Sequence, residues 1–108
     1  VPILRSRDLR RSAVCYGDLL GFAVFREADC LRIRCSDLDV KLVHTNDCDI
    51  ISNLSVVFRT GKIRKLHCEF IERALPNLGN LKLNTRGKLQ FSLSDPDGNN
   101  LYFVEDIA

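Results

Sequence analysis

A short extended run that is rich in apolar residues opens each half of the chain. Residues 1–6 and 54–60 are such runs, and each precedes a segment whose apolar residues recur at helical spacing. Three further runs of β-forming residues follow each helical segment. They read GFAVFRE, DCLRIRCS and DVKLVH in the first half, and LKLNT, KLQFSLS and NLYFVED in the second. The pattern predicts a strand, a helix and three strands, twice over.

The two helical segments have predictable ends. The first begins after an N-cap at Asp8 and stops at Gly21, while Pro76 ends the second. The apolar stripe of the first helix consists of Leu9, Ala13, Tyr16 and Leu20, and that of the second of Ile63, Leu66, Phe70 and Ala74. Each helix is therefore expected to cover one face of a four-stranded sheet.

The chain also repeats itself at an offset of 54 residues. LRSRDLRRSAVCY (4–16) lies over FRTGKIRKLHCEF (58–70), and CLRIRCSD (30–37) lies over KLQFSLSD (88–95) with four extra residues in the second copy. Both pairs occur in the same order, which predicts one domain built from two βαβββ repeats, about 1–50 and 54–108. The DPDGNN segment (95–100) has turn chemistry and predicts a turn between two strands.

Composition narrows the class of protein. With 108 residues, 45% hydrophobic and 28% charged, the chain suits a single globular domain. Its apolar stretches are too short to span a bilayer, and the net charge of +2 does not demand a polyanionic partner. Five cysteines without C-x-x-C spacing, and no signal-peptide pattern after Val1, favour a reducing cytoplasm.

The two ends of the chain resemble a known family. VPILRSRDLRRSAVCYGDLLGF is similar to the first strand, helix and exit of the vicinal oxygen chelate superfamily, and LQFSLSDPDGNNLYFVED is similar to its closing hairpin. That group contains glyoxalase I, extradiol dioxygenases, fosfomycin-resistance enzymes and bleomycin-resistance proteins. The resemblance implies an α+β fold in which two βαβββ modules form curved mixed sheets around a cleft.

Metal-dependent members of that superfamily hold a divalent ion with His, Gln or Glu on the first and last strand of each half. The resemblance places Val1, Lys41, Ser55 and Tyr102 at these positions. An alkyl group, an ammonium, a hydroxyl and a phenol are poor ligands for such an ion. We therefore expect no metal, no other cofactor and no catalytic residue, and place the chain nearest the bleomycin-resistance type, whose members bind a bulky ligand as dimers.

Strand alternation then predicts which side chains would line the cleft. Leu4, Phe58, Phe91, Leu93, Leu101 and Phe103 are expected to face the helices. The predicted ligand-binding residues on the opposite face are Arg5, Lys41, Val57, Arg59, Gln90, Ser92, Tyr102 and Val104. Their mixture of apolar and basic groups suits an amphipathic neutral or anionic small molecule, with antibiotics among the candidates. A homodimer is expected, because a partner would cover exposed strand edges.

Several alternatives remain open at this stage. The arginines of the cleft, Arg5 and Arg59, could pair with Glu27, Glu105 or Asp106 and bind no ligand. A glyoxalase-like lyase or dioxygenase could use non-standard metal ligands, or Tyr102 and Arg59 as general acid and anion clamp. Cys/His chemistry at His44 and Cys48 or at His67 and Cys68 is weighed against a packing role. Nucleic-acid binding by the basic helix residues is weighed against a solvated surface, and no membrane partner is expected.

Overall fold

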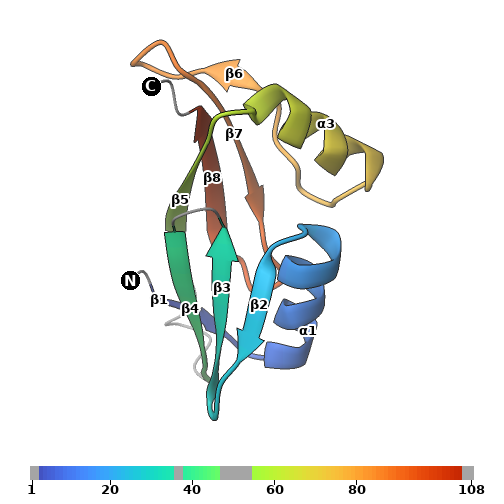
Figure 1. Ribbon diagram of the computed structural model, residues 1–108, viewed down its shortest axis with the longest axis vertical. Helices are drawn as coiled ribbons and strands as arrows, with labels where there is room; N and C mark the ends of the chain where they lie inside the picture. The colour runs from blue at the N-terminus through green and yellow to red at the C-terminus, as the bar shows by residue number, and fades with distance from the viewer. Residues whose placement is uncertain (1–2, 36–37, 47–54, 106–108) are drawn as a thin grey trace.

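The computed structural model describes residues 3–35, 38–46 and 55–105 (Figure 1). The first half contains β1 (Ile3–Ser6), α1 (Leu9–Ala13), the π-helix η1 (Val14–Leu19), β2 (Ala23–Arg26), β3 (Cys30–Cys35) and β4 (Leu38–His44). The second half contains β5 (Ser55–Thr60), α3 (Ile63–Glu72), β6 (Lys82–Leu83), β7 (Leu89–Ser94) and β8 (Asn100–Glu105). The predicted α+β fold with a repeated βαβββ order is confirmed.

The strands form two sheets with the same topology. Their orders are β1-β4-β3-β2 and β5-β8-β7-β6, and in each sheet one parallel pair, β1 with β4 or β5 with β8, accompanies antiparallel neighbours. The two sheets lie end to end along the 38 Å axis, with both helical layers on the same side (Figure 1). Each sheet therefore has one face covered by a helix and one face directed away from it, which we call the outer face.

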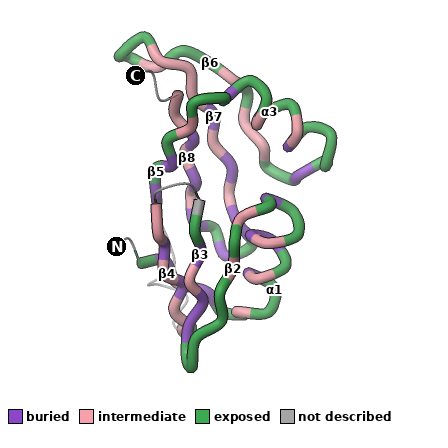
Figure 2. The backbone as a smooth tube through the Cα atoms, in the orientation of Figure 1, coloured by how far each residue is buried: buried purple, intermediate pink, exposed green. Residues whose placement is uncertain are grey.

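The core lies between the sheets and the helices (Figure 2). Phe103 on β8 is fully buried and stacks on Phe58 and Phe91 at centroid distances of 5.1 and 4.9 Å. Phe70 on α3 meets Phe103 edge-on at 5.6 Å. Phe22, from the first half, reaches Phe58 at 5.3 Å, so the aromatic core continues from one half into the other.

The observed start of the first helix agrees with the prediction, whereas the end of the second differs from it. Asp8 is the N-cap of α1, where its side chain accepts hydrogen bonds from the backbone of Arg10 and Arg11. Ala74, by contrast, is not part of the buried stripe: it is exposed with φ at 54°, and Leu75 is buried instead. The reason is that α3 ends at Glu72, since the residue before Pro76 is disfavoured in helical conformation.

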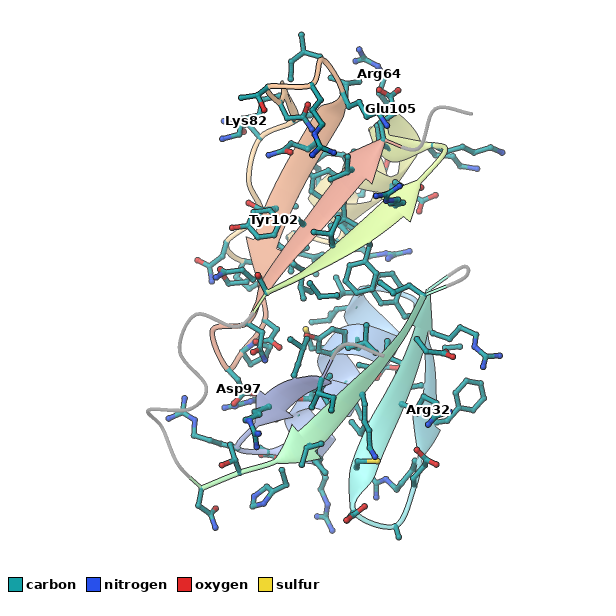
Figure 3. All side chains as sticks on the ribbon, turned by 90° about the vertical axis from the view of Figure 1, so that its left-hand side faces the viewer. Arg32, Arg64, Lys82, Asp97, Tyr102 and Glu105 are labelled. Atoms are coloured by element: carbon teal, nitrogen blue, oxygen red, sulfur yellow. The ribbon has the colours of Figure 1, made fainter. Side chains whose placement is uncertain are left out.

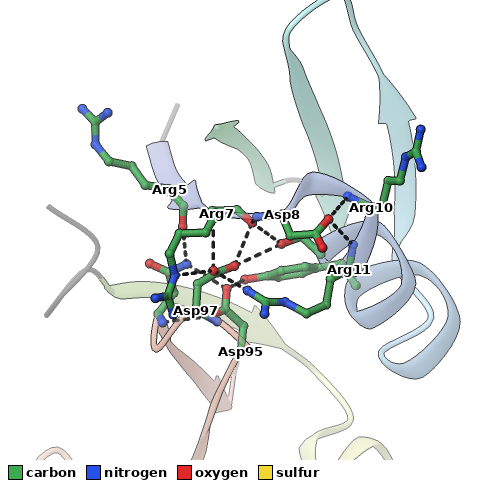
Figure 4. Close-up of polar contacts among 11 residues, drawn as sticks. Arg5, Arg7, Asp8, Arg10, Arg11, Asp95 and Asp97 are labelled. Carbon is green, nitrogen blue, oxygen red and sulfur yellow. Dashed lines mark hydrogen bonds and ion pairs between the residues drawn. The ribbon is translucent and has the colours of Figure 1, made fainter. Parts of the chain in front are cut away.

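The predicted turn at 95–100 does more than reverse the chain. It docks against the first half through carboxylates that are almost completely buried (Figure 4). Tyr16 on η1 donates its hydroxyl hydrogen to Asp95 Oδ2 at 2.6 Å, and Asn99 Nδ2 donates to the carbonyl oxygen of Arg5 at 2.9 Å. Burial, and then the Asp95 charge, raise the pKa of Tyr16 far above its usual range, so the phenol remains a donor.

Asp97 accepts hydrogen bonds from several groups of the first half. Its carboxylate accepts from Ser6 Oγ at 2.7 Å, from the Arg7 backbone N–H at 3.1 Å and from Arg11 Nη2 at 2.6 Å. Burial alone would raise the pKa of Asp97, but these donors outweigh it and the pKa lies below its usual value. We call the contacts of Asp95, Asp97 and Asn99 with the first half the clasp, because they join the two halves by charge-assisted hydrogen bonds.

Candidate functional site

Six of the eight predicted ligand residues lie together on the outer face of the second sheet. On the parallel pair β5 and β8, Val57 is beside Tyr102 and Arg59 is beside Val104. On the antiparallel pair β7 and β8, Ser92 is beside Tyr102 and Gln90 is beside Val104. These registers place the six side chains in two adjacent rows, which we call the outer patch. All six are exposed or half-buried, whereas the intervening residues of the same strands are buried.

The other two predicted residues, Arg5 and Lys41, belong to the first sheet. Lys41 lies beside Ile3, and Arg5 lies beside Val43, also on an outer face. Both sheets present their outer faces to the viewer in Figure 3, where Tyr102 marks the second sheet and Arg32 the first. The structure therefore places Arg5 and Lys41 on the predicted side of the molecule, but on a different sheet from the outer patch.

A pocket of about 340 Å³ opens at one end of the outer patch. Half of its lining consists of predicted residues, namely Val57, Arg59, Gln90 and Val104. The other half comes from the hairpin that joins β6 to β7, namely Asn84, Thr85, Arg86 and Lys88. Sequence reasoning missed these four residues. The available signal was the segment NTRGK, a turn with two cations directly before a strand that carries the predicted Gln90.

The hairpin is held in a defined shape by Asn84. Its Oδ1 accepts from the backbone N–H groups of Arg86 at 2.8 Å and Lys88 at 3.0 Å, and its Nδ2 donates to Gln90 Oε1 at 3.2 Å. Gly87 adopts φ of +74°, which a residue with a side chain rarely adopts. Two backbone donors determine the orientation of the Asn84 amide, so Gln90 offers its oxygen to Asn84, and its NH₂ group has no hydrogen-bond partner among the described residues.

Charge in the pocket has one sign. Arg59, Arg86 and Lys88 form no ion pair with any carboxylate in the described ranges 3–35, 38–46 and 55–105, and the pocket lining contains no acidic residue. Neither of the carboxylates considered as partners of Arg59 forms an ion pair with it among the described residues. Glu105 Oε1 accepts from the Leu89 backbone at 3.3 Å, and Asp106 lies outside the described residues.

Arg5 likewise makes no ion pair with a described carboxylate, and Glu27 pairs with Arg32 at 3.5 Å instead. The alternative in which these carboxylates neutralise the cleft arginines therefore finds no support in the described part of the chain.

The positions implied for a divalent metal do not offer suitable ligands. Lys41 and Tyr102 lie on outer faces, Ser55 is exposed at the start of β5, and Val1 lies outside the described residues. An ammonium, a hydroxyl and a phenol do not form the imidazole and carboxylate set that such an ion requires. Within the described residues no group of three or more His, Cys, Asp or Glu side chains could hold a metal.

Cys/His chemistry finds no support where it can be checked. The Gly79 carbonyl can only accept, so His67 Nε2 donates to it, at 2.9 Å, and the imidazole packs on Phe91 at 4.7 Å. Cys68 is exposed beside it. Cys48, the partner considered for His44, lies outside the described residues. His67 thus has a packing role.

The remaining alternatives concern larger partners. For nucleic-acid binding, the basic residues Arg10, Arg64 and Lys65 are exposed on the helices, which is equally expected of a solvated surface. Arg11 forms an ion pair with Asp97. None of the helices in the described ranges has the length and apolar composition needed to cross a bilayer.

Comparison with solved structures identifies the fold. A bleomycin-binding protein in complex with bleomycin superimposes with a TM-score of 0.84 at 24% identity, over 99% of this chain and 97% of that one. The chain has the fold shared by bleomycin-binding and glyoxalase-related proteins. A lactoylglutathione lyase from Agrobacterium tumefaciens gives 0.79 at 15% identity over 95% and 89%, and an antibiotic-binding protein from a Streptomyces species gives 0.78 at 20% over 97% and 92%. No protein-family profile and no curated protein sequence matches the chain.

The resemblance to the vicinal oxygen chelate superfamily is therefore confirmed at the level of the fold, and the bleomycin-binding type is among the similar structures. Because these identities are below 25%, the likeness does not carry a ligand or a reaction to this chain. The ligand and any reaction therefore have to be inferred from the outer patch and its pocket.

Proposed function

We propose that this protein binds a small amphipathic molecule, neutral or anionic, at the outer patch, and that it does so without a metal and without transforming the ligand. The observation that carries the proposal is the pocket in which the apolar side chains of Val57 and Val104 lie beside three cations that have no ion-pair partner among the described residues. An apolar wall with a few polar groups at one end is the usual character of a small-molecule site. Val57 is 50% exposed, so apolar surface is available for burial by a ligand.

The similar structures support binding as the general activity. Two of them are described as a bleomycin-binding protein with bleomycin and as an antibiotic-binding protein. Antibiotics therefore belong in the first set of ligands to be tested here. The unpaired cations disfavour strongly cationic drugs, since like charges repel in a partly desolvated pocket.

The enzyme alternative has weaker support. Tyr102 and Arg59 lie on the same outer face, on neighbouring strands and offset by two residues. No described side chain forms a hydrogen bond with the Tyr102 hydroxyl, so no relay that would move its proton is present. A lyase or dioxygenase would also need metal ligands that Lys41, Ser55 and Tyr102 do not supply.

We also propose a homodimer located in the cytoplasm. The first sheet has exposed apolar residues on its outer face, Ile3 at 54% and Phe25 at 49%, which a second copy could cover. Sedimentation velocity at micromolar concentration should give twice the mass of the chain. A monomer at that concentration would overturn this part of the proposal.

Thermal shift against a panel of neutral, anionic and cationic amphipathic compounds, bleomycin included, tests the function. A ligand at 100 times its Kd stabilises the folded state by about 2.7 kcal/mol, which raises Tm by roughly 10 °C. We expect a neutral or anionic member of the panel to reach such a shift with one-to-one stoichiometry and to be recovered unchanged. Turnover of the ligand, or a panel in which only cationic compounds bind, would contradict the proposal.

A further inference from the structure

The side chains that enclose the pocket between β5 and the β6–β7 hairpin offer donors almost exclusively. The guanidinium groups of Arg59 and Arg86 and the ammonium of Lys88 have no acceptor atom. Gln90 also lines the pocket, and its NH₂ group is available as a donor because its oxygen is bound to Asn84. A ligand group that fits among these donors must carry several acceptor oxygens and a negative charge.

The hairpin backbone that carries Arg86 and Lys88, and the Gln90 amide, are held in place before any ligand binds. The Asn84 side chain accepts from two backbone N–H groups of the hairpin and donates to the Gln90 side chain, and the Asn84 backbone N–H donates to the Lys88 carbonyl at 2.8 Å. The hairpin that presents Arg86 and Lys88 therefore has little backbone freedom to lose. Such preorganisation favours binding of a compact group over loose attraction by mobile surface charges.

We propose that this pocket binds the oxyanion end of the ligand, a phosphate, sulfate or carboxylate group, while the apolar body of the ligand lies along Val57 and Val104 toward Tyr102. The inference rests on the proposed function and adds to it a headgroup chemistry and an orientation. Three cations without a carboxylate partner in the described part of the chain favour a dianionic group over a singly charged one. A cationic headgroup should be repelled.

Four naphthalene compounds with one common apolar body test this assignment. They are 2-naphthyl phosphate, 2-naphthoate, 2-naphthalenemethanol and 2-naphthylmethylamine, titrated into the ¹⁵N-labelled full chain at pH 7.5 and low salt. We expect the phosphate to bind about tenfold more tightly than the alcohol, the carboxylate to be intermediate and the amine to be weakest. The amide signals that move most should belong to Asn84 through Gln90. A carboxylate that binds more tightly than the phosphate would contradict the preference for a dianion.

Variants separate the pocket from general positive charge. Arg86→Gln and Lys88→Gln should each weaken phosphate binding about threefold to fivefold and leave the alcohol unchanged. Gln90→Glu keeps an acceptor oxygen for Asn84 and adds a negative charge, so it should weaken the phosphate most and improve the amine. Arg64→Gln, an exposed α3 residue outside the pocket, is the matched control and should change neither.

The outcomes distinguish this inference from the function on which it rests. It is wrong if the phosphate binds no more tightly than the alcohol, if Arg64→Gln weakens the phosphate as much as Arg86→Gln does, or if no probe binds. Binding of the alcohol at the outer patch in either of the first two cases would leave the proposed function standing. The function itself fails only on the broader thermal-shift panel.

Discussion

Replacing Asp97 by Ala tests whether the clasp stabilises the fold. The side chain of Asp97 is completely buried and accepts from Ser6 Oγ, the Arg7 backbone and Arg11. A hydrogen bond to a charged group contributes about 1.5–3 kcal/mol. The Arg11 side chain is 44% exposed, so its pairing with Asp97 contributes at most about 1 kcal/mol.

The truncation also leaves the Ser6 hydroxyl and the Arg7 N–H without this acceptor. Since the contacts are not additive, we expect Asp97→Ala to lower the free energy of unfolding by about 3–5 kcal/mol, no more than the sum of its two charge-assisted hydrogen bonds to Ser6 and the Arg7 backbone. Urea denaturation at fixed protein concentration measures it. Asp18→Ala, which removes an exposed carboxylate of η1, is the matched control and should change stability by no more than about 0.5 kcal/mol.

The effect has a defined pH dependence. Because the folded-state pKa of Asp97 lies below the ordinary value of 3.8, its contribution is complete above that pH and is lost as the pH falls through the folded-state pKa. The stability difference between wild type and Asp97→Asn should therefore be constant from pH 7 to 5 and shrink below about 3.8. An Asp97→Ala protein as stable as Asp18→Ala, or a difference that grows in acid, would refute this account of the clasp.

Two further predictions concern other buried groups. Tyr16→Phe removes the donor to the Asp95 carboxylate and should lower the free energy of unfolding by about 1.5–3 kcal/mol in the same urea assay, and a loss below about 0.5 kcal/mol would contradict the contact. Burial, and then the nearby Asp95 charge, raise the pKa of Cys15 to about 11 from 9.0, which leaves roughly a hundredfold less thiolate at pH 8. Iodoacetamide labelling read by peptide mass should therefore modify the exposed Cys68 well before Cys15, and equal rates would contradict it.

Alternation was enough to predict which strand residues are buried. Leu4, Phe58 and Phe103 all face the helices as expected, because a sheet with one covered face admits only one register for its apolar side chains. The same rule located the outer patch. Alternation could not locate the pocket, since the hairpin residue Arg86 approaches Arg59 only through the pairing of β6 with β7.

The sequence by itself determined the repeated βαβββ order, the buried and outer faces of the strands and the turn at 95–100, because these depend on local periodicity and turn chemistry. Only the tertiary structure decided that Asp97 is buried against Ser6, some 90 residues away, and that Arg59 lacks a carboxylate partner among the described residues. Both facts depend on which distant side chains meet. Hydrogen bonds and ion pairs act over a few ångströms in space, whatever the separation along the chain.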